Sequence, residues 1–172
     1  LSHISHIQSY TTGKFMVIDS STRRNLELVE TMREKNKRGS LLWVLDKTKT
    51  AMGARTLRSY IEQPLIEKDE IVARQAAVRE LNQNAISREE IREYLNPVYD
   101  LERLIGRIIY KTANPRDFIA FKSSLSMLPY IKNLLQDFSS PLLGEIEDEL
   151  DPLEDLFALI DEAIIEEPPL AI

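Results

Sequence analysis

The stretch Lys37–Leu65 (KRGSLLWVLDKTKTAMGARTLRSYIEQPL) predicts how the chain is built. Its first part holds a short apolar run, LLWVL, which polar residues then interrupt. A second apolar pattern follows at spacings of three, four and four residues, which places its members on one face of a helix. Proline at position 64 ends this pattern because it cannot donate the helical hydrogen bond. The members of the second pattern are Ala54, Leu57, Ile61 and Leu65.

We expect these two helices to meet at a structural corner formed by Trp43, Gly53 and Leu57. Trp43 is the single tryptophan of the chain, and the missing side chain of Gly53 would allow a close approach between helices. No residue of the corner is a catalytic group. The stretch therefore predicts a structural role rather than a catalytic one.

The remaining segments are also helical in pattern. Asn114-Pro115 combines a capping residue with proline at the first helical position, which is a strong signal for a helix start. Ser140-Pro141 and Asp151-Pro152 repeat this device. With only 5 glycines for tight turns, and a single apolar run at residues 15–18 that could form a strand, the chain predicts an all-α fold. We expect an irregular multi-helix bundle with at most one short strand.

The C-terminal part predicts long, lever-like helices. Apolar residues alternate at spacings of three and four over three heptads, as in a coiled-coil seam. We expect this seam to lack a full partner within the chain. Its residues are Leu143, Ile146, Leu150, Leu153, Phe157, Ile160 and Ile164.

Length and composition restrict the class of protein. A chain of 172 residues is long enough for one domain, and we expect a single domain over residues 1–172. It contains no cysteine, which fits a reducing, cytoplasmic compartment and excludes thiolate metal sites. No apolar run has the length of a membrane span, and the sequence resembles an excised piece because it opens without methionine.

Charge divides the chain into two parts. Residues 133–172 contain twelve acidic residues and no Lys or Arg. Residues 1–132 therefore carry all 22 bases against 16 of the 28 acids, a net charge of +6. Phosphate contacts, if the chain makes any, belong to the first part.

Arg103, Arg107 and Lys111 recur every four residues opposite the apolar face of a predicted helix that begins at Asp100. This basic row is the best candidate nucleic-acid contact of the chain, but no aromatic residues are interleaved with it, so we favour a solvated face over a nucleic-acid contact. His3 and His6 lie three residues apart, but a metal ion would need a third ligand that the sequence does not offer.

Catalytic motifs are missing. Gly13-Lys14 lacks the upstream glycine and the following hydroxyl residue of a phosphate-binding loop, and there is no nucleophile elbow or HExxH pattern. We therefore expect that this chain is not an enzyme by itself and that it binds no cofactor.

Four ordered motifs nevertheless resemble the core domain of the MutS family of DNA mismatch-repair proteins. They cover nearly the whole chain, and their combination and spacing make the resemblance specific. One departure is Glu67, where the family pattern leads us to expect a capping aspartate. The motifs are MVIDSSTRRNLEL, SLLWVLDKTKTAMGARTLRSYIEQPL, VARQAAVREL and DLERLIGRIIYKTANPRDFIAFKSSLSMLP.

The resemblance implies a part of a larger, cytoplasmic protein. In that family a helical core with lever helices links a mismatch-reading domain and a DNA clamp to an ATPase that uses ATP and Mg²⁺. It implies mismatched double-stranded DNA, other domains of the same protein and a second subunit of a homodimer as partners. This sequence would be the core up to the start of the clamp, so no mismatch-reading or nucleotide-binding residue is carried over.

Two other interpretations remain open at this stage. The chain could be a self-contained helical adaptor that binds a protein partner along its acidic C-terminal helices. It could instead be a free-standing DNA-binding module that uses the basic row. A phosphate-binding loop downstream in the full-length gene would favour the MutS interpretation over both.

Overall fold

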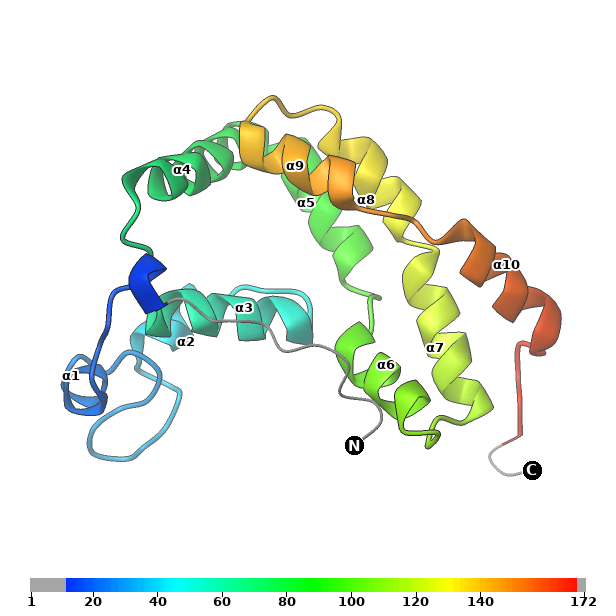
Figure 1. The fold of residues 1–172 in the computed structure, drawn as a ribbon, viewed down its shortest axis with the longest axis horizontal. Coiled ribbons are helices and arrows are strands. Elements are labelled where there is room, and N and C mark those ends of the chain that lie inside the picture. Colours follow the sequence, from blue (N-terminus) through cyan, green and yellow to red (C-terminus); the bar gives the residue numbers. More distant parts are fainter. Residues whose placement is uncertain (1–11, 170–172) are drawn as a thin grey trace. The chain divides into compact units, whose positions relative to one another are not determined.

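The computed structural model describes residues 12–169, and within this range every regular element is a helix. Phe15 and Leu65 form an isolated antiparallel bridge in place of the expected short strand. The prediction of an all-α fold is confirmed (Figure 1). The α-helices are α1 Ser20–Asn25, α2 Leu41–Leu45, α3 Ala51–Glu62, α4 Lys68–Gln83, α5 Ala85–Leu95, α6 Leu101–Ile109, α7 Pro115–Leu125, α8 Leu128–Leu135, α9 Pro141–Glu149 and α10 Glu154–Ala163, preceded by a 3-10 turn, η1 Thr12–Lys14.

The helices form two compact units. The first unit contains residues 1–46 and 57–71, and the second contains residues 47–56 and 72–172. Two of the three boundaries between the units therefore lie inside α3 and α4, and the third lies between α2 and α3.

The first unit is built around α1 and α2. Asp19 caps α1 by accepting hydrogen bonds from the backbone N–H groups of Ser21 and Thr22. The loop that follows delivers Leu28 to the interior, and Leu42 of α2 joins it there. Among the described residues of this unit, these two are the buried apolar side chains.

The second unit contains two apolar clusters. In the first, α5, α8 and α9 enclose a core together with Ala77 of α4. In the second, α6 and α10 both pack on α7 (Figure 1). The first cluster contains Ala77, Ile131, Leu135, Phe138 and Leu143, and the second contains Leu104, Phe121, Leu125 and Ile160.

The start of α7 confirms the predicted capping at Asn114. Its side chain accepts a hydrogen bond from the Asp117 N–H at 3.1 Å, and Asp117 accepts one from the Asn114 N–H at 2.7 Å. Proline at position 115 needs no partner there because it has no N–H. Helix α7 ends at Leu125 and α8 begins at Leu128, so the two are nearly continuous.

The expected C-terminal seam is broken between two short helices and is only partly covered within the chain. The segment breaks into α9 and α10, of 9 and 10 residues. Ile160 is buried, while Leu153 and Phe157 are partly buried against the second cluster. Ile146 alone among the described seam residues is strongly exposed, at 43%. The three- and four-residue spacing in the sequence predicts the apolar face, but it does not reveal the break between α9 and α10.

The break lies at Asp151–Leu153. Asp151 does not cap a helix as its Asp-Pro context predicts; its carboxylate accepts a hydrogen bond from the Leu153 N–H at 2.9 Å. Leu153 then adopts a left-handed backbone conformation (φ 54°, ψ 46°) at the N-cap of α10. Lys132 of α8 holds the end of α9 by donating to the carbonyls of Glu147 and Leu150 at 2.9 and 2.8 Å.

The second cluster should control the stability of its unit. Leu125 is 1% exposed, so Leu125→Ala removes buried methyl groups and leaves a cavity that close-packed neighbours fill only partly. We expect a loss of about 2–5 kcal/mol in the free energy of unfolding, measured by urea titration. Ile86→Ala is the control, because Ile86 is 82% exposed and its truncation should cost less than about 0.5 kcal/mol. Equal costs for the two variants would contradict the assignment of this core.

Candidate functional site

The predicted basic row does not lie along one helix face. Helix α6 ends at Ile109, and Lys111 follows it with a positive φ of 56°. Arg103 is exposed on α6 and borders a hollow of about 300 Å³ that Arg107 also lines. The structure thus places two of the three residues together and the third beyond the helix end.

Arg107 already has an anionic partner. Its guanidinium donates to the buried Asp117 carboxylate at 2.7 Å and to the Thr112 carbonyl at 3.4 Å. Asp117 belongs to the first turn of α7, so this ion pair joins the end of α6 to the start of α7. A phosphate at Arg107 would have to compete with this carboxylate.

A second ion pair joins two helices that are distant in sequence. Arg55 of α3 donates to both carboxylate oxygens of Asp100 at 2.8 and 2.7 Å, and it also donates to Glu102. Asp100 accepts the Arg103 N–H at 3.3 Å as well, which caps α6. The hydrogen bonds from Arg55 hold the pKa of Asp100 below its ordinary value and raise the pKa of Arg55. This bidentate geometry fixes the start of α6 to α3.

Glu80 of α4 anchors the loop between α8 and α9. Its carboxylate accepts hydrogen bonds from the Ser139 N–H at 2.7 Å, the Ser139 hydroxyl at 2.8 Å and the Ser140 N–H at 2.8 Å. The Ser139 backbone N–H is the main cause that lowers the pKa of Glu80 to about 2. Neither this contact nor the Arg55 pair is visible in a local sequence pattern, since the partners are 45 to 60 residues apart.

The residues of the predicted corner have different environments. Trp43 is 46% exposed and Leu57 is partly buried. A Cβ atom at Gly53 would meet the Thr50 hydroxyl at 3.1 Å and Thr48 at 3.5 Å, so the closest neighbours of this glycine are local. Its role in a helix-to-helix approach stays a prediction.

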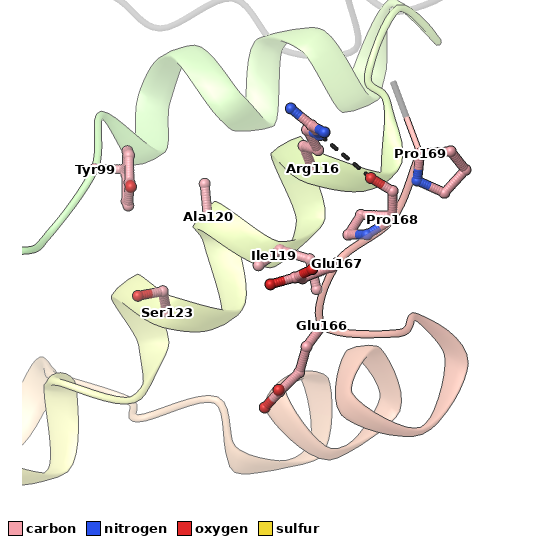
Figure 2. A pocket seen from close by; sticks show the side chains of 9 residues that line it. All are labelled: Tyr99, Arg116, Ile119, Ala120, Ser123, Glu166, Glu167, Pro168 and Pro169. Carbon is pink, nitrogen blue, oxygen red and sulfur yellow. Dashed lines mark hydrogen bonds between the residues drawn. The ribbon is translucent and has the colours of Figure 1, made fainter. Parts of the chain in front are cut away.

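A hollow of about 520 Å³ lies between α7 and the segment that follows α10 (Figure 2). Arg116 donates to the Pro168 carbonyl at 3.3 Å across it. Glu166 and Glu167 border the same hollow, but no nucleophile with an adjacent base is present among its lining residues. The hydrogen bond from Arg116 ties the segment after α10 to α7.

Other site classes gain no support within residues 12–169. No cluster of three or more potential metal-binding side chains occurs in this range, and none of its helices is long and apolar enough to cross a membrane. His3 and His6 lie outside the described residues.

The family model for MutS domain III matches residues 21–172 of this chain. The chain belongs to the MutS family. The predicted resemblance is confirmed, and the four motifs on which it rested all lie wholly or mainly inside the matched range.

Curated MutS relatives match over all 172 residues. The DNA mismatch repair protein MutS of Lachnoclostridium phytofermentans is 69% identical, and those of Ruminiclostridium cellulolyticum and Acetivibrio thermocellus are 52% and 51% identical. In each case 100% of this chain is covered, but only 18%, 20% and 20% of the relative. The chain thus spans about a fifth of the length of these MutS proteins.

The Glu80 contact should make stability depend on pH. The pKa of Glu80 is about 2 in the folded state, below its ordinary value of 4.5. The ionised carboxylate therefore contributes its full stabilisation above about pH 4.5, and this contribution is lost as the pH falls toward 2. Glu80→Gln should lower the melting temperature at neutral pH, and the difference from the parent chain should shrink on acidification. Thermal melts between pH 2 and 7 measure both; a difference that stays constant with pH would show that the Glu80 charge is not involved.

DNA binding by the isolated chain should be weak. With Arg107 and Asp117 paired and Lys111 off the helix, the +6 charge of residues 1–132 offers only a diffuse attraction to phosphate. We expect fluorescence anisotropy to give equal affinities for matched and mismatched duplexes and a steep loss of affinity between about 50 and 200 mM salt. A clear preference for the mismatch would assign the reading function to this segment.

Proposed function

We propose that this chain is the domain III segment of a DNA mismatch-repair protein, where it links the binding of mismatched DNA to ATP hydrolysis elsewhere in the polypeptide. The observation that carries the proposal is the 69% identity, over the whole chain, to a protein named DNA mismatch repair protein MutS. In this proposal residues 1–172 form one structural domain that ends where the clamp begins.

The contacts between helices support a linking role. A segment transmits a change between remote sites only if its elements are joined into a network with defined arrangements. Arg55 joins α3 to α6, Arg107 joins α6 to α7, and Glu80 joins α4 to the loop before α9. These polar contacts connect elements that the apolar clusters alone would allow to slide.

The chemistry of the longer protein would reside outside this chain. ATP and Mg²⁺ would bind in another domain, mismatched double-stranded DNA would be read by another, and a second subunit would complete a cytoplasmic homodimer. In this proposal none of these activities takes a group from residues 12–169.

The decisive experiment compares two arginines of α3 in the full-length protein. Arg55→Ala removes the ties to α6, whereas the control Arg58→Ala removes an exposed pair with Glu62 within the same helix. We expect both variants to keep mismatch binding and ATP hydrolysis. ATP should release mismatched DNA less effectively in Arg55→Ala alone. The measure is the ratio of the DNA affinities without and with ATP. We expect this ratio to fall by roughly 5- to 150-fold, which is the typical size of coupling between two sites.

Two results would count against the proposal. An unchanged effect of ATP in Arg55→Ala would mean that this network does not link the two sites. A full-length protein that binds matched and mismatched duplexes equally would remove the assignment to mismatch repair altogether.

A further inference from the structure

Helix α10 is attached to the rest of the second unit along one side. It packs on α7, and Ile160 is the one buried residue among its ten (Figure 1). Phe157 is partly buried against the second cluster, whereas Leu159 is 60% exposed. A helix of this length is only marginally stable alone in water. Helix α10 therefore keeps its form because it lies on α7.

The packing beneath α10 is incomplete at both of its ends. A hollow of about 260 Å³ lies next to its start, where Leu125, Pro152 and Phe157 are among the lining residues. The hollow of about 520 Å³ lies past its other end, between α7 and the segment that follows α10 (Figure 2). Side chains that border a hollow forgo van der Waals contacts on that side. Helix α10 is therefore held less firmly at its ends than at Ile160 in its middle.

The joint at residues 151–153 is anchored more firmly on the side of α9. Lys132 of α8 donates hydrogen bonds to the Glu147 and Leu150 carbonyls at 2.9 and 2.8 Å, which fixes the end of α9. The start of α10 has no side-chain cap, and Leu153 there adopts a left-handed backbone conformation with a φ of 54°. This conformation is unfavourable for a residue with a Cβ atom, and it is relieved when α10 leaves α7. Strain at the joint therefore favours the opening of α10 over that of α9.

Two polar contacts hold residues 154–169 on α7. The Lys122 ammonium donates to the Asp161 carboxylate at 2.8 Å, and Arg116 donates to the Pro168 carbonyl at 3.3 Å. Residues 154–169 include six acids and no Lys or Arg, so α7 supplies the cation of both contacts. The Asp161 side chain is 60% exposed, and an ion pair in such a position adds only a small attraction.

We propose that residues 154–169 form a strap that opens from α7 as one unit. Residues 151–153 are its hinge, and the ion pair between Lys122 and Asp161 is its latch. Helix α9 stays in place when the strap opens, because Lys132 holds it to α8. Opening uncovers the apolar side of α7 that α10 covers in the closed form. The strap is a property of this chain and does not rest on the proposed link between DNA binding and ATP hydrolysis.

Amide hydrogen exchange in the full-length protein tests the strap. In a local opening, the hydrogen-bonded amides of α10 exchange while α7 and α9 stay folded. We expect the protection of residues 157–164 to be on the order of tenfold lower than that of residues 119–126 and 145–150, which report on α7 and α9. Low concentrations of urea should accelerate exchange in α7 but leave α10 nearly unchanged, because a local opening exposes little surface.

Two exchange patterns would overturn the strap. Equal protection and an equal response to urea in α10 and α7 would mean that the second cluster opens as a whole. Lower protection in α9 than in α10 would place the opening segment on the other side of the hinge.

A matched pair of substitutions tests the latch in the same protein. Asp161→Asn removes the charge that Lys122 binds, whereas Asp148→Asn removes the same charge from an exposed position on α9. We expect Asp161→Asn to speed exchange at residues 157–164 by roughly 1.5- to 5-fold, the effect of losing an exposed ion pair, and to leave residues 119–126 unchanged. Asp148→Asn should change neither segment.

The latch and the strap can fail separately in this comparison. No effect of Asp161→Asn, or an equal effect of Asp148→Asn, would overturn the latch. Faster exchange of residues 119–126 in Asp161→Asn, by the same factor as residues 157–164, would overturn the strap because α10 would then open only together with α7.

Discussion

Asp117 joins the formation of α7 to the position of α6. Its carboxylate accepts hydrogen bonds from the Asn114 N–H and from Arg107, both at 2.7 Å, while the side chain itself is largely buried. Helix α7 then carries the second apolar cluster, on which α6 and α10 both pack. Removing this carboxylate would leave the partly buried Arg107 guanidinium without its carboxylate partner and the Asn114 N–H without its acceptor at the start of α7. The geometry of the second unit therefore depends on Asp117.

The two units differ in how much apolar surface they bury to offset the conformational entropy lost on folding. The second unit buries apolar side chains from seven helices in two clusters, supported by polar contacts at helix ends. The first unit buries Leu28 and Leu42 and leaves larger side chains in water. Such a unit gains little stability from its own interior.

Local signals in the sequence were reliable where the physics is local. Asp19, Asp100 and Asn114 begin helices as their types and neighbours predict, because a cap needs only the backbone two or three residues away. Asp151 failed as a cap because Leu153 follows in a left-handed conformation, and Lys111 left its helix through a positive φ. Both departures occur where a helix meets its neighbours, which a periodic pattern does not record.

The long-range contacts were beyond a single sequence. The Arg55–Asp100 and Glu80–Ser139 pairs join positions 45 and 59 residues apart, and nothing in the composition around them distinguishes these residues from solvated charges. The exposure of Trp43 was likewise unexpected, since tryptophan next to leucines normally indicates a core. Family membership, by contrast, followed from unusual combinations of residues and needed no three-dimensional information.

The left-handed backbone at Leu153 has a mechanical consequence. A non-glycine residue in this conformation costs about 1–2 kcal/mol, and Leu153 offsets part of that cost by packing on the second cluster. Glycine there would relieve the strain but give up the packing and free the joint. The bend between α9 and α10 thus depends on a strained residue whose side chain packs against the second cluster, so a single substitution at Leu153 should change how freely the bend moves.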